Sequence, residues 1–230
     1  MTTREDYITA VRYMVKGELP LGEPEIIMAI SQALKEHSQI HPRLVSEDES
    51  GTGSFDYAVT LFAEWSQGYS VIKKVEYPVD DSTPSNSPLQ DDAWTIYAKP
   101  AGKFLRFLED IPAAGQSFRV TYSALHAVTD AASTVDAFDD EAVQALAASY
   151  FCSMISTYFA QTQDSTIQAD SVDHKNKSRD YEARAKAYRK MYFDHMGIAD
   201  GETVPASVTR DQDMRPSWQT DKITHPRKFR

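Results

Sequence analysis

The chain has 230 residues, of which 41% are hydrophobic and 11% aromatic, and it carries a formal net charge of −10. This length and apolar content can bury a sizeable core, which excludes a disordered chain and favours one domain, with or without an excursion. The negative charge argues against general nucleic-acid binding, because such binding needs lysine and arginine to replace the counterions around phosphates.

The sequence indicates a reducing, cytoplasm-like environment. Cys152 is the single cysteine, so no internal disulfide can form, and its place in an apolar helical pattern predicts a small buried side chain. The first residues alternate acidic and basic groups without the apolar core of a signal peptide. No stretch reaches about 18 apolar residues, so no membrane span is expected.

Two helices are predicted in the first unit, residues 1–42. Thr3 and Asp6 have the spacing of a capping box, and apolar residues then recur at helical spacing as far as Gly17. Pro24 suits the first turn of a second helix, and Pro42 prevents its continuation. An apolar stripe between these prolines predicts one buried face: Ile26, Ile27, Ile30, Ala33 and Leu34.

The second unit, residues 43–130, is predicted to be an antiparallel β block. The hydrophobic period falls to two in "SVIKKVEYP", "AWTIYAKP", "KFLRFLED" and "SFRVTYSAL". The proline and glycine of "KPAGK" and "DIPAAGQ" suit tight reversals between these segments. The polar stretch Asp80 to Asp92, which surrounds Leu89, predicts a solvated loop or a contact finger.

The third unit, residues 131–199, returns to helical periodicity and completes the bundle. One wide apolar face is predicted from Val143, Leu146, Ala147, Tyr150, Phe151, Met154, Ile155, Tyr158 and Phe159. A narrower seam follows at Tyr181, Ala185, Tyr188, Tyr192 and Met196, and Gly197 is placed to end that helix. We expect an antiparallel helix pair. The basic residues on its other faces predict a solvated surface, or alternatively a subunit interface at Arg179, Arg184, Tyr188 and Arg189.

Residues 200–230 differ from the rest of the chain in charge. Residues 204–230 hold six basic and three acidic side chains, a net charge of +3, which leaves −13 on the remainder. This segment is predicted to be an extended arm without a core of its own. The expected fold class is therefore α+β: a helical bundle with an inserted antiparallel β block and an extended C-terminal arm.

The sequence predicts no catalytic, cofactor or metal site. His37 and His41 have a spacing that can bind zinc, but Glu36 precedes the pair and Pro42 ends the helix, so surface histidines are the preferred interpretation. Solvation and the helix dipole account for the carboxylates Asp91, Asp92, Asp139, Asp140 and Glu141. "GTGS" lacks the context of a phosphate loop, and no serine lies in a G-x-S-x-G turn.

The order of these elements, together with several of their sequences, is similar to that of a known protein family. With "SVIKKVEYP", "AWTIYA", "FRVTYSALH", the long apolar helix, "ADSVDHKNKSRDYEARAKAYRKMYFDHMG" and the terminal "THPRKFR", the chain resembles the head-to-tail adaptor, or connector, proteins of tailed bacteriophages. The similarity covers roughly Ser54 to Gly197 and the terminal segment.

This resemblance implies a structural virion protein of the neck that is not an enzyme and needs no cofactor. Such adaptors form a ring, commonly of twelve subunits, on the portal protein, hold the next neck or tail protein, and extend the channel through which DNA passes non-specifically. Assembly takes place in the host cytoplasm. A C-terminal arm that docks on the portal would use Arg215, Trp218, Lys222, His225, Arg227, Lys228, Phe229 and Arg230.

Two other classes stay open at this stage. A tail-terminator or other neck ring protein would share the architecture with a different partner. A metal-dependent hydrolase would use His37, His41 and an acidic residue, and would bind a stoichiometric metal ion as a monomer or dimer.

Overall fold

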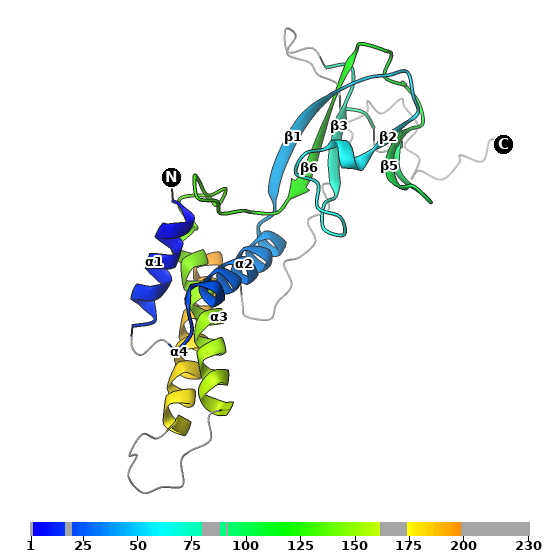
Figure 1. Cartoon of the computed structure of the whole chain (residues 1–230). Coiled ribbons are helices and arrows are strands. Elements are labelled where there is room, and N and C mark those ends of the chain that lie inside the picture. The colour runs from blue at the N-terminus through cyan, green and yellow to red at the C-terminus, as the bar shows by residue number, and fades with distance from the viewer. Residues whose placement is uncertain (1, 17–19, 80–87, 91, 162–173, 199–230) are drawn as a thin grey trace, which may run out of the picture.

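The computed structural model describes residues 2–16, 20–79, 88–90, 92–161 and 174–198. It confirms an α+β fold in which helices and strands form two bodies joined end to end (Figure 1). In chain order the elements are α1 (Arg4–Met14), α2 (Glu23–Ile40), β1 (Arg43–Ser50), β2 (Asp56–Ala58), the short 3-10 helix η1 (Val59–Leu61), β3 (Ile72–Glu76), β4 (Trp94–Lys99), β5 (Gly102–Phe107), β6 (Ser117–Ala124), α3 (Asp140–Gln161) and α4 (His174–Met196).

Local sequence signals set the ends of the first two helices. The Thr3 hydroxyl accepts a hydrogen bond from the Asp6 backbone N–H, and the Asp6 carboxylate accepts one from the Thr3 N–H, which completes the predicted capping box. At the start of α2, the Glu25 carboxylate accepts from the N–H of Gly22 at 2.9 Å. Proline lies in the first turn of α2, and the helix ends at its C-cap residue His41, immediately before Pro42.

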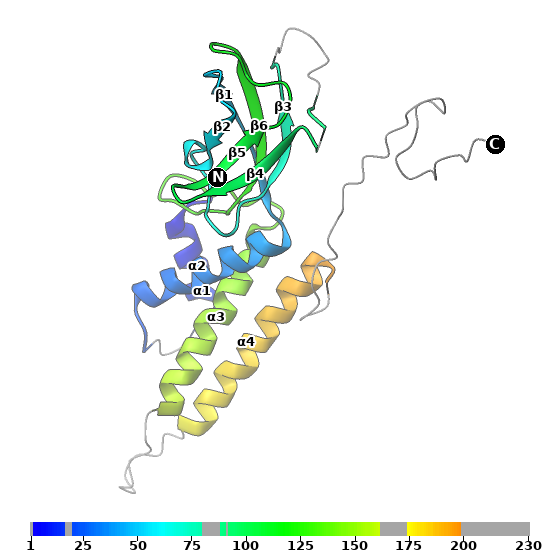
Figure 2. The ribbon, with the colours of Figure 1, turned by 90° about the vertical axis from the view of Figure 1, so that its right-hand side faces the viewer.

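The long helices α3 and α4 lie side by side and antiparallel, as predicted (Figures 1 and 2). Both α1 and α2 pack against α3, so the four helices share one core. α4 ends at Gly197, whose positive φ of 67° is a left-handed conformation that glycine adopts without a Cβ clash. This arrangement brings the C-terminal end of α4 back beside the N-terminal end of α3.

The β block consists of two three-stranded antiparallel sheets with a common core. One sheet has the order β1-β6-β3 and the other β2-β5-β4. Tyr57 and Phe107 of the second sheet pack on Phe118 of the first, with ring centres 4.7 and 5.2 Å from that of Phe118. The four quoted segments therefore form strands as expected, and β1 and β2 add two strands that had not been assigned individually.

Both connections between the two bodies cross at one place, which we call the junction (residues 40–43 and 124–139). The chain leaves α2 at Ile40 and enters β1 at Arg43, and it returns from β6 at Ala124 towards α3. Figure 1 shows the junction between the helices below and the strands above. Any polar group at this point can influence how the bodies are held relative to each other.

Two predicted features fall wholly or mostly outside the described residues. The C-terminal arm, with all its proposed docking residues, lies in residues 199–230, and most of the Asp80 to Asp92 loop lies in 80–87 and 91. Within that loop, Leu89 is described, and it packs against the β core while its N–H donates to the Val75 carbonyl at 2.8 Å. Among the helices of the described residues, none combines the length and apolar character needed to cross a membrane.

Candidate functional site

Three histidine rings meet at the junction. His37 comes from the last turn of α2, His41 caps that helix, and His126 lies just after β6. The centre of the His37 ring is 4.9 Å from that of His126 and 5.8 Å from that of His41, and the His41 and His126 centres are 6.4 Å apart. One donor nitrogen from each ring can be chosen so that all three lie within 4.8 Å of one another. We call this group the histidine cluster.

Each ring has its Nδ1 atom beside a polar group outside the cluster. His37 Nδ1 is 3.0 Å from the Tyr192 hydroxyl of α4, and His126 Nδ1 is 3.0 Å from the Thr134 carbonyl oxygen. His41 Nδ1 lies 3.7 Å from Asp139 Oδ2. These contacts come from α4 and from the segment between β6 and α3, which holds both Thr134 and Asp139, so the histidine cluster is oriented by parts of the chain far from α2 in the sequence.

His37 is the most deeply buried member, with 0% of its surface exposed. Its Nε2 atom has no hydrogen-bond partner among the described residues. Burial, reinforced by the neighbouring His126, lowers the pKa of His37 to about 4, because the charged imidazolium is poorly solvated there. His37 is therefore a neutral imidazole at pH 7, with a lone pair available on one nitrogen.

Both ring nitrogens of His126 face hydrogen-bond acceptors. Its Nδ1 faces the Thr134 carbonyl and its Nε2 faces the His41 carbonyl, both at 3.0 Å. Carbonyl oxygens only accept hydrogen bonds, and a neutral imidazole has a single N–H to donate. The neutral ring therefore satisfies one of these carbonyls and turns a lone pair towards the other.

Asp139 is the acidic neighbour of the cluster and is largely buried. His195 Nε2 of α4 lies 2.8 Å from Asp139 Oδ1, while the opposite oxygen faces His41. Asp136, Asp139 and His41 form a second group whose donor atoms lie within 4.8 Å of one another. The expectation that solvation accounts for Asp139 was wrong, because the returning C-terminal end of α4 covers it.

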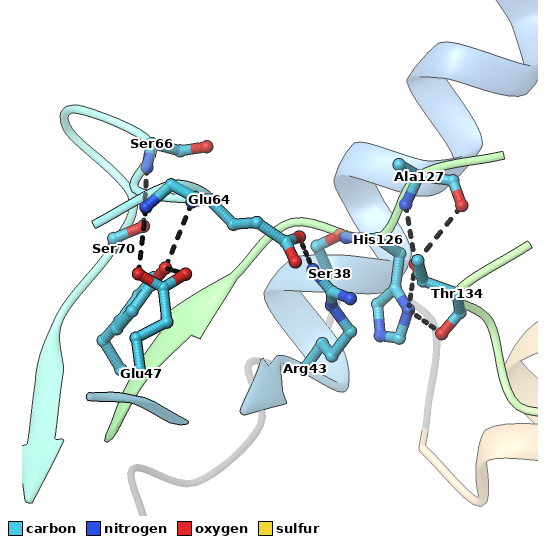
Figure 3. A network of polar contacts seen from close by, with 11 residues as sticks. Ser38, Arg43, Glu47, Glu64, Ser66, Ser70, His126, Ala127 and Thr134 are labelled. Atoms are coloured by element: carbon cyan, nitrogen blue, oxygen red, sulfur yellow. Dashed lines mark hydrogen bonds and ion pairs between the residues drawn. The ribbon is translucent and has the colours of Figure 1, made fainter. Parts of the chain in front are cut away.

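The junction is also tied together through the backbone. Ser38 Oγ of α2 accepts the N–H of His126 at 2.9 Å and donates to the Leu34 carbonyl at 2.6 Å. On the strand side, Arg43 pairs with Glu64, and Thr134 holds the backbone of Ala127 (Figure 3). These contacts leave little freedom for the segments that carry His41 and His126.

The prediction of surface histidines holds for His41, which is exposed, and is wrong for His37. Spacing on α2 indicated the first two members but gave no sign of His126, which lies after another strand of the β block. The i, i+4 spacing of His37 and His41 on α2 was the one sequence signal for the histidine cluster. That β6 returns beside the end of α2, and so brings His126 there, is seen only in the fold.

The four candidate interface residues all lie on α4. Three of them have contacts within the subunit: Arg189 binds Glu36, the Tyr188 hydroxyl donates to the Met14 carbonyl at 2.6 Å, and Arg184 Nη1 donates to the Lys16 carbonyl at 3.2 Å. Arg179 is exposed. Their proposed role between subunits stays a prediction.

Cys152, by contrast, belongs to the helical core. It is fully buried, and this burial raises the pKa of its thiol to about 11, so the reactive thiolate is rare at neutral pH.

Compared with models of protein families and with curated proteins, the chain matches none of them. Function must therefore be argued from the sequence and from the geometry described above.

Proposed function

We propose that this protein is a structural subunit of a bacteriophage neck: a head-to-tail adaptor that assembles as a ring on the portal, holds the next neck or tail protein, and extends the DNA channel. It acts in the virion and is assembled in the host cytoplasm. The proposal rests on the resemblance of the sequence, and one feature of the fold supports it in particular.

That feature is the exposed edge of the second sheet. β4 is the outer strand in the order β2-β5-β4, so one row of its backbone N–H and C=O groups has no strand partner among the described residues. Ile96 and Tyr97 on this strand are 38% and 42% exposed. Monomeric proteins usually protect such an edge with charge, proline or a bulge, because it can pair with another chain. An edge that carries apolar side chains suits a protein that meets a neighbouring subunit.

The charge distribution is consistent with the same role. A net charge of −13 outside residues 204–230 gives a surface that repels the DNA backbone, so that DNA passes without being held. The +3 segment supplies the opposite charge, together with Trp218 and Phe229 as apolar anchors for a partner. We assign portal docking to this segment.

The test is native mass spectrometry of the full chain with the portal protein of the same virus. We expect a closed ring with several copies of the chain for each portal, twelve being the common number in such adaptors. A chain that lacks Ser217 to Arg230 should keep its fold and lose most of its binding, and higher salt should weaken the full chain more than the truncated one. A single copy per portal, an open filament as the native assembly, or equal affinity of both chains would contradict the proposal.

A matched pair of variants tests the edge strand. Ile96→Glu puts a charge on β4 and should prevent ring closure while portal docking through the C-terminal segment persists. Met28→Glu places the same charge on an exposed position of α2 and should leave the ring intact. If both variants still close the ring, β4 is not the contact between subunits.

A further inference from the structure

The geometry points to a divalent transition-metal site, of the class that binds zinc, formed by His37, His41 and His126 at the junction. The site is independent of the proposed ring and portal contacts. Imidazole nitrogens are common ligands for Zn²⁺, and three histidines are a known protein ligand set that leaves a fourth position for water. Three observations support this site: the ring spacing, the outer contact of each Nδ1 atom, and the surroundings of Nε2 on His37 and His126.

The spacing of the rings is close to what one ion requires. Nitrogens about 2.1 Å from a tetrahedral zinc place the centres of their imidazole rings roughly 5 Å apart. The observed separations are 4.9, 5.8 and 6.4 Å, and the two longer ones both involve His41. Because His41 has 51% of its side chain exposed, its ring can turn inward without moving the backbone, and this rotation would shorten both of the longer separations.

The outer contacts select the same nitrogen in every ring. A metal-bound histidine usually binds through one nitrogen and donates its other N–H to a carboxylate, a carbonyl or another polar oxygen. Here the Nδ1 atoms face the Tyr192 hydroxyl, the Asp139 carboxylate and the Thr134 carbonyl. Nε2 is therefore the nitrogen left for a ligand on His37 and on His41. On His126, Nε2 also lies 3.0 Å from the His41 carbonyl oxygen and must give up that contact to bind an ion.

Two of these Nε2 atoms have surroundings that a cation would suit. His37 Nε2 is buried without a hydrogen bond among the described residues, which is costly for a polar atom. His126 Nε2 lies 3.0 Å from the His41 carbonyl oxygen, and in the neutral tautomer whose Nδ1–H donates to Thr134 it turns a lone pair towards that oxygen. A cation between the rings satisfies both lone pairs at once. His41 on the exposed side gives the ion a path from solvent.

Asp139 adds charge to this arrangement without being needed as a ligand. Its carboxylate lies beyond His41 and is held on its far side by His195. A carboxylate behind a metal-bound histidine increases the basicity of the ring and fixes its orientation. The ion would join the end of α2 to the segment that follows β6, and so would fix the junction between the two bodies.

The experiment uses the full chain after treatment with a chelator. Zn²⁺ is titrated by calorimetry, and Co²⁺ is used as a visible-absorption probe of a four-coordinate site. We expect one ion per chain and a higher Tm in its presence, because a ligand that binds only the folded state stabilises it. His41→Asn, a change at an exposed position, should weaken binding by at least about 100-fold, whereas Tyr192→Phe, which removes the hydroxyl beside His37 Nδ1, should weaken it by about tenfold.

His225→Asn is the matched control, since it removes a histidine of the terminal segment and should leave the affinity unchanged. Circular dichroism of each variant without metal shows whether it is folded. The inference is overturned if the folded full chain binds no ion at micromolar Zn²⁺, if His41→Asn binds as tightly as the natural chain, or if His225→Asn alone abolishes binding. None of these outcomes bears on ring formation, so the two proposals fail separately.

Discussion

Arg189 of α4 donates from both terminal nitrogens to the two carboxylate oxygens of Glu36 in α2, at 2.7 and 3.1 Å. The Tyr150 hydroxyl of α3 donates to the same carboxylate at 2.6 Å. Three helices are therefore joined through one partly buried side chain. Such a bidentate pair is directional, and a lysine in place of the arginine could not reproduce it.

Replacing this carboxylate should destabilise the helical body. Glu36→Ala leaves Arg189 and Tyr150 without their common acceptor, and we expect a loss of about 2 kcal/mol, which corresponds to a Tm decrease of roughly 4–8 °C for a protein of this size. Glu182→Ala removes an exposed carboxylate that pairs with Lys186 one turn away on α4, and should cost much less, because solvent screens that pair. If urea unfolding gave the same loss of stability for both variants, the Glu36 network would contribute no more than an exposed ion pair.

Gly51 should tolerate no side chain. A Cβ atom there would lie 2.5 Å from the Ala113 carbonyl oxygen and 2.9 Å from that of Gln116, both of which are backbone atoms that cannot turn away. We expect Gly51→Ala to cost about 1–3 kcal/mol in a denaturant titration. The control is Gly22→Ala, where the nearest atoms are 3.5 Å away; no clash is added there, and the loss should be limited to the poorer N-cap preference of alanine, about 0.5–1 kcal/mol.

Much of this fold could be predicted because its signals are local. Helix ends are set within one turn by the capping box at Thr3, by the two prolines around α2 and by Gly197. These helix boundaries can therefore be read from a short stretch of sequence. β1 was harder to assign. Its sequence "RLVSEDES" is mostly polar, because alternate side chains face solvent and the strand is stabilised chiefly by pairing with β6. That pairing partner begins at Ser117, far along the chain.

The candidate site could be predicted only in part for the same reason. Spacing on one helix brings His37 and His41 together, whereas His126 and Asp139 reach them through the return of β6 and the packing of α3 and α4. No property of a short segment encodes such a meeting. The burial of His37 was missed because α4, which covers it with Tyr192, is separated from it by the whole β block.

Cys152 should react slowly with thiol reagents in the folded protein. It is buried in α3, and its thiol pKa is raised to about 11, so both access and thiolate population are low. We expect alkylation by iodoacetamide at pH 8 to be slower by at least about 100-fold in buffer than in guanidinium chloride. Comparable rates in the two conditions would mean that this part of the helical core opens readily.

The contribution of the second sheet to stability should fall in acid. Asp56 of β2 accepts two hydrogen bonds from Arg106, at 2.7 and 2.9 Å, and a further one from Lys99; these contacts hold the pKa of its carboxyl well below the usual range. Because the pKa in the folded state is lower than the unfolded value of about 3.9, the contribution of Asp56 is complete above that pH. It is lost as the pH falls towards the lower, folded-state pKa.

The measurement is the stability of the natural chain and of Asp56→Asn in urea between pH 7 and pH 3. The natural chain should be the more stable at pH 7, and the difference should shrink below about pH 4 as the carboxylate is protonated. A difference that stays constant down to pH 3, or that grows, would show that the ion pairs of Asp56 do not contribute in this way.

The position of the junction also sets the order in which the protein can fold during synthesis. α2 packs on α3, yet the whole β block is translated between them, which takes roughly 5–20 seconds at about 5–20 residues per second. All six strands leave the ribosome before α3 does, so both sheets of the β block can close once β6 has emerged. In that time α2 has α1 beside it but lacks α3, its main partner. A nascent chain stalled so that β6 has left the ribosomal exit tunnel while α3 has not should therefore present a folded β block attached to an α2 whose apolar stripe is a binding site for chaperones.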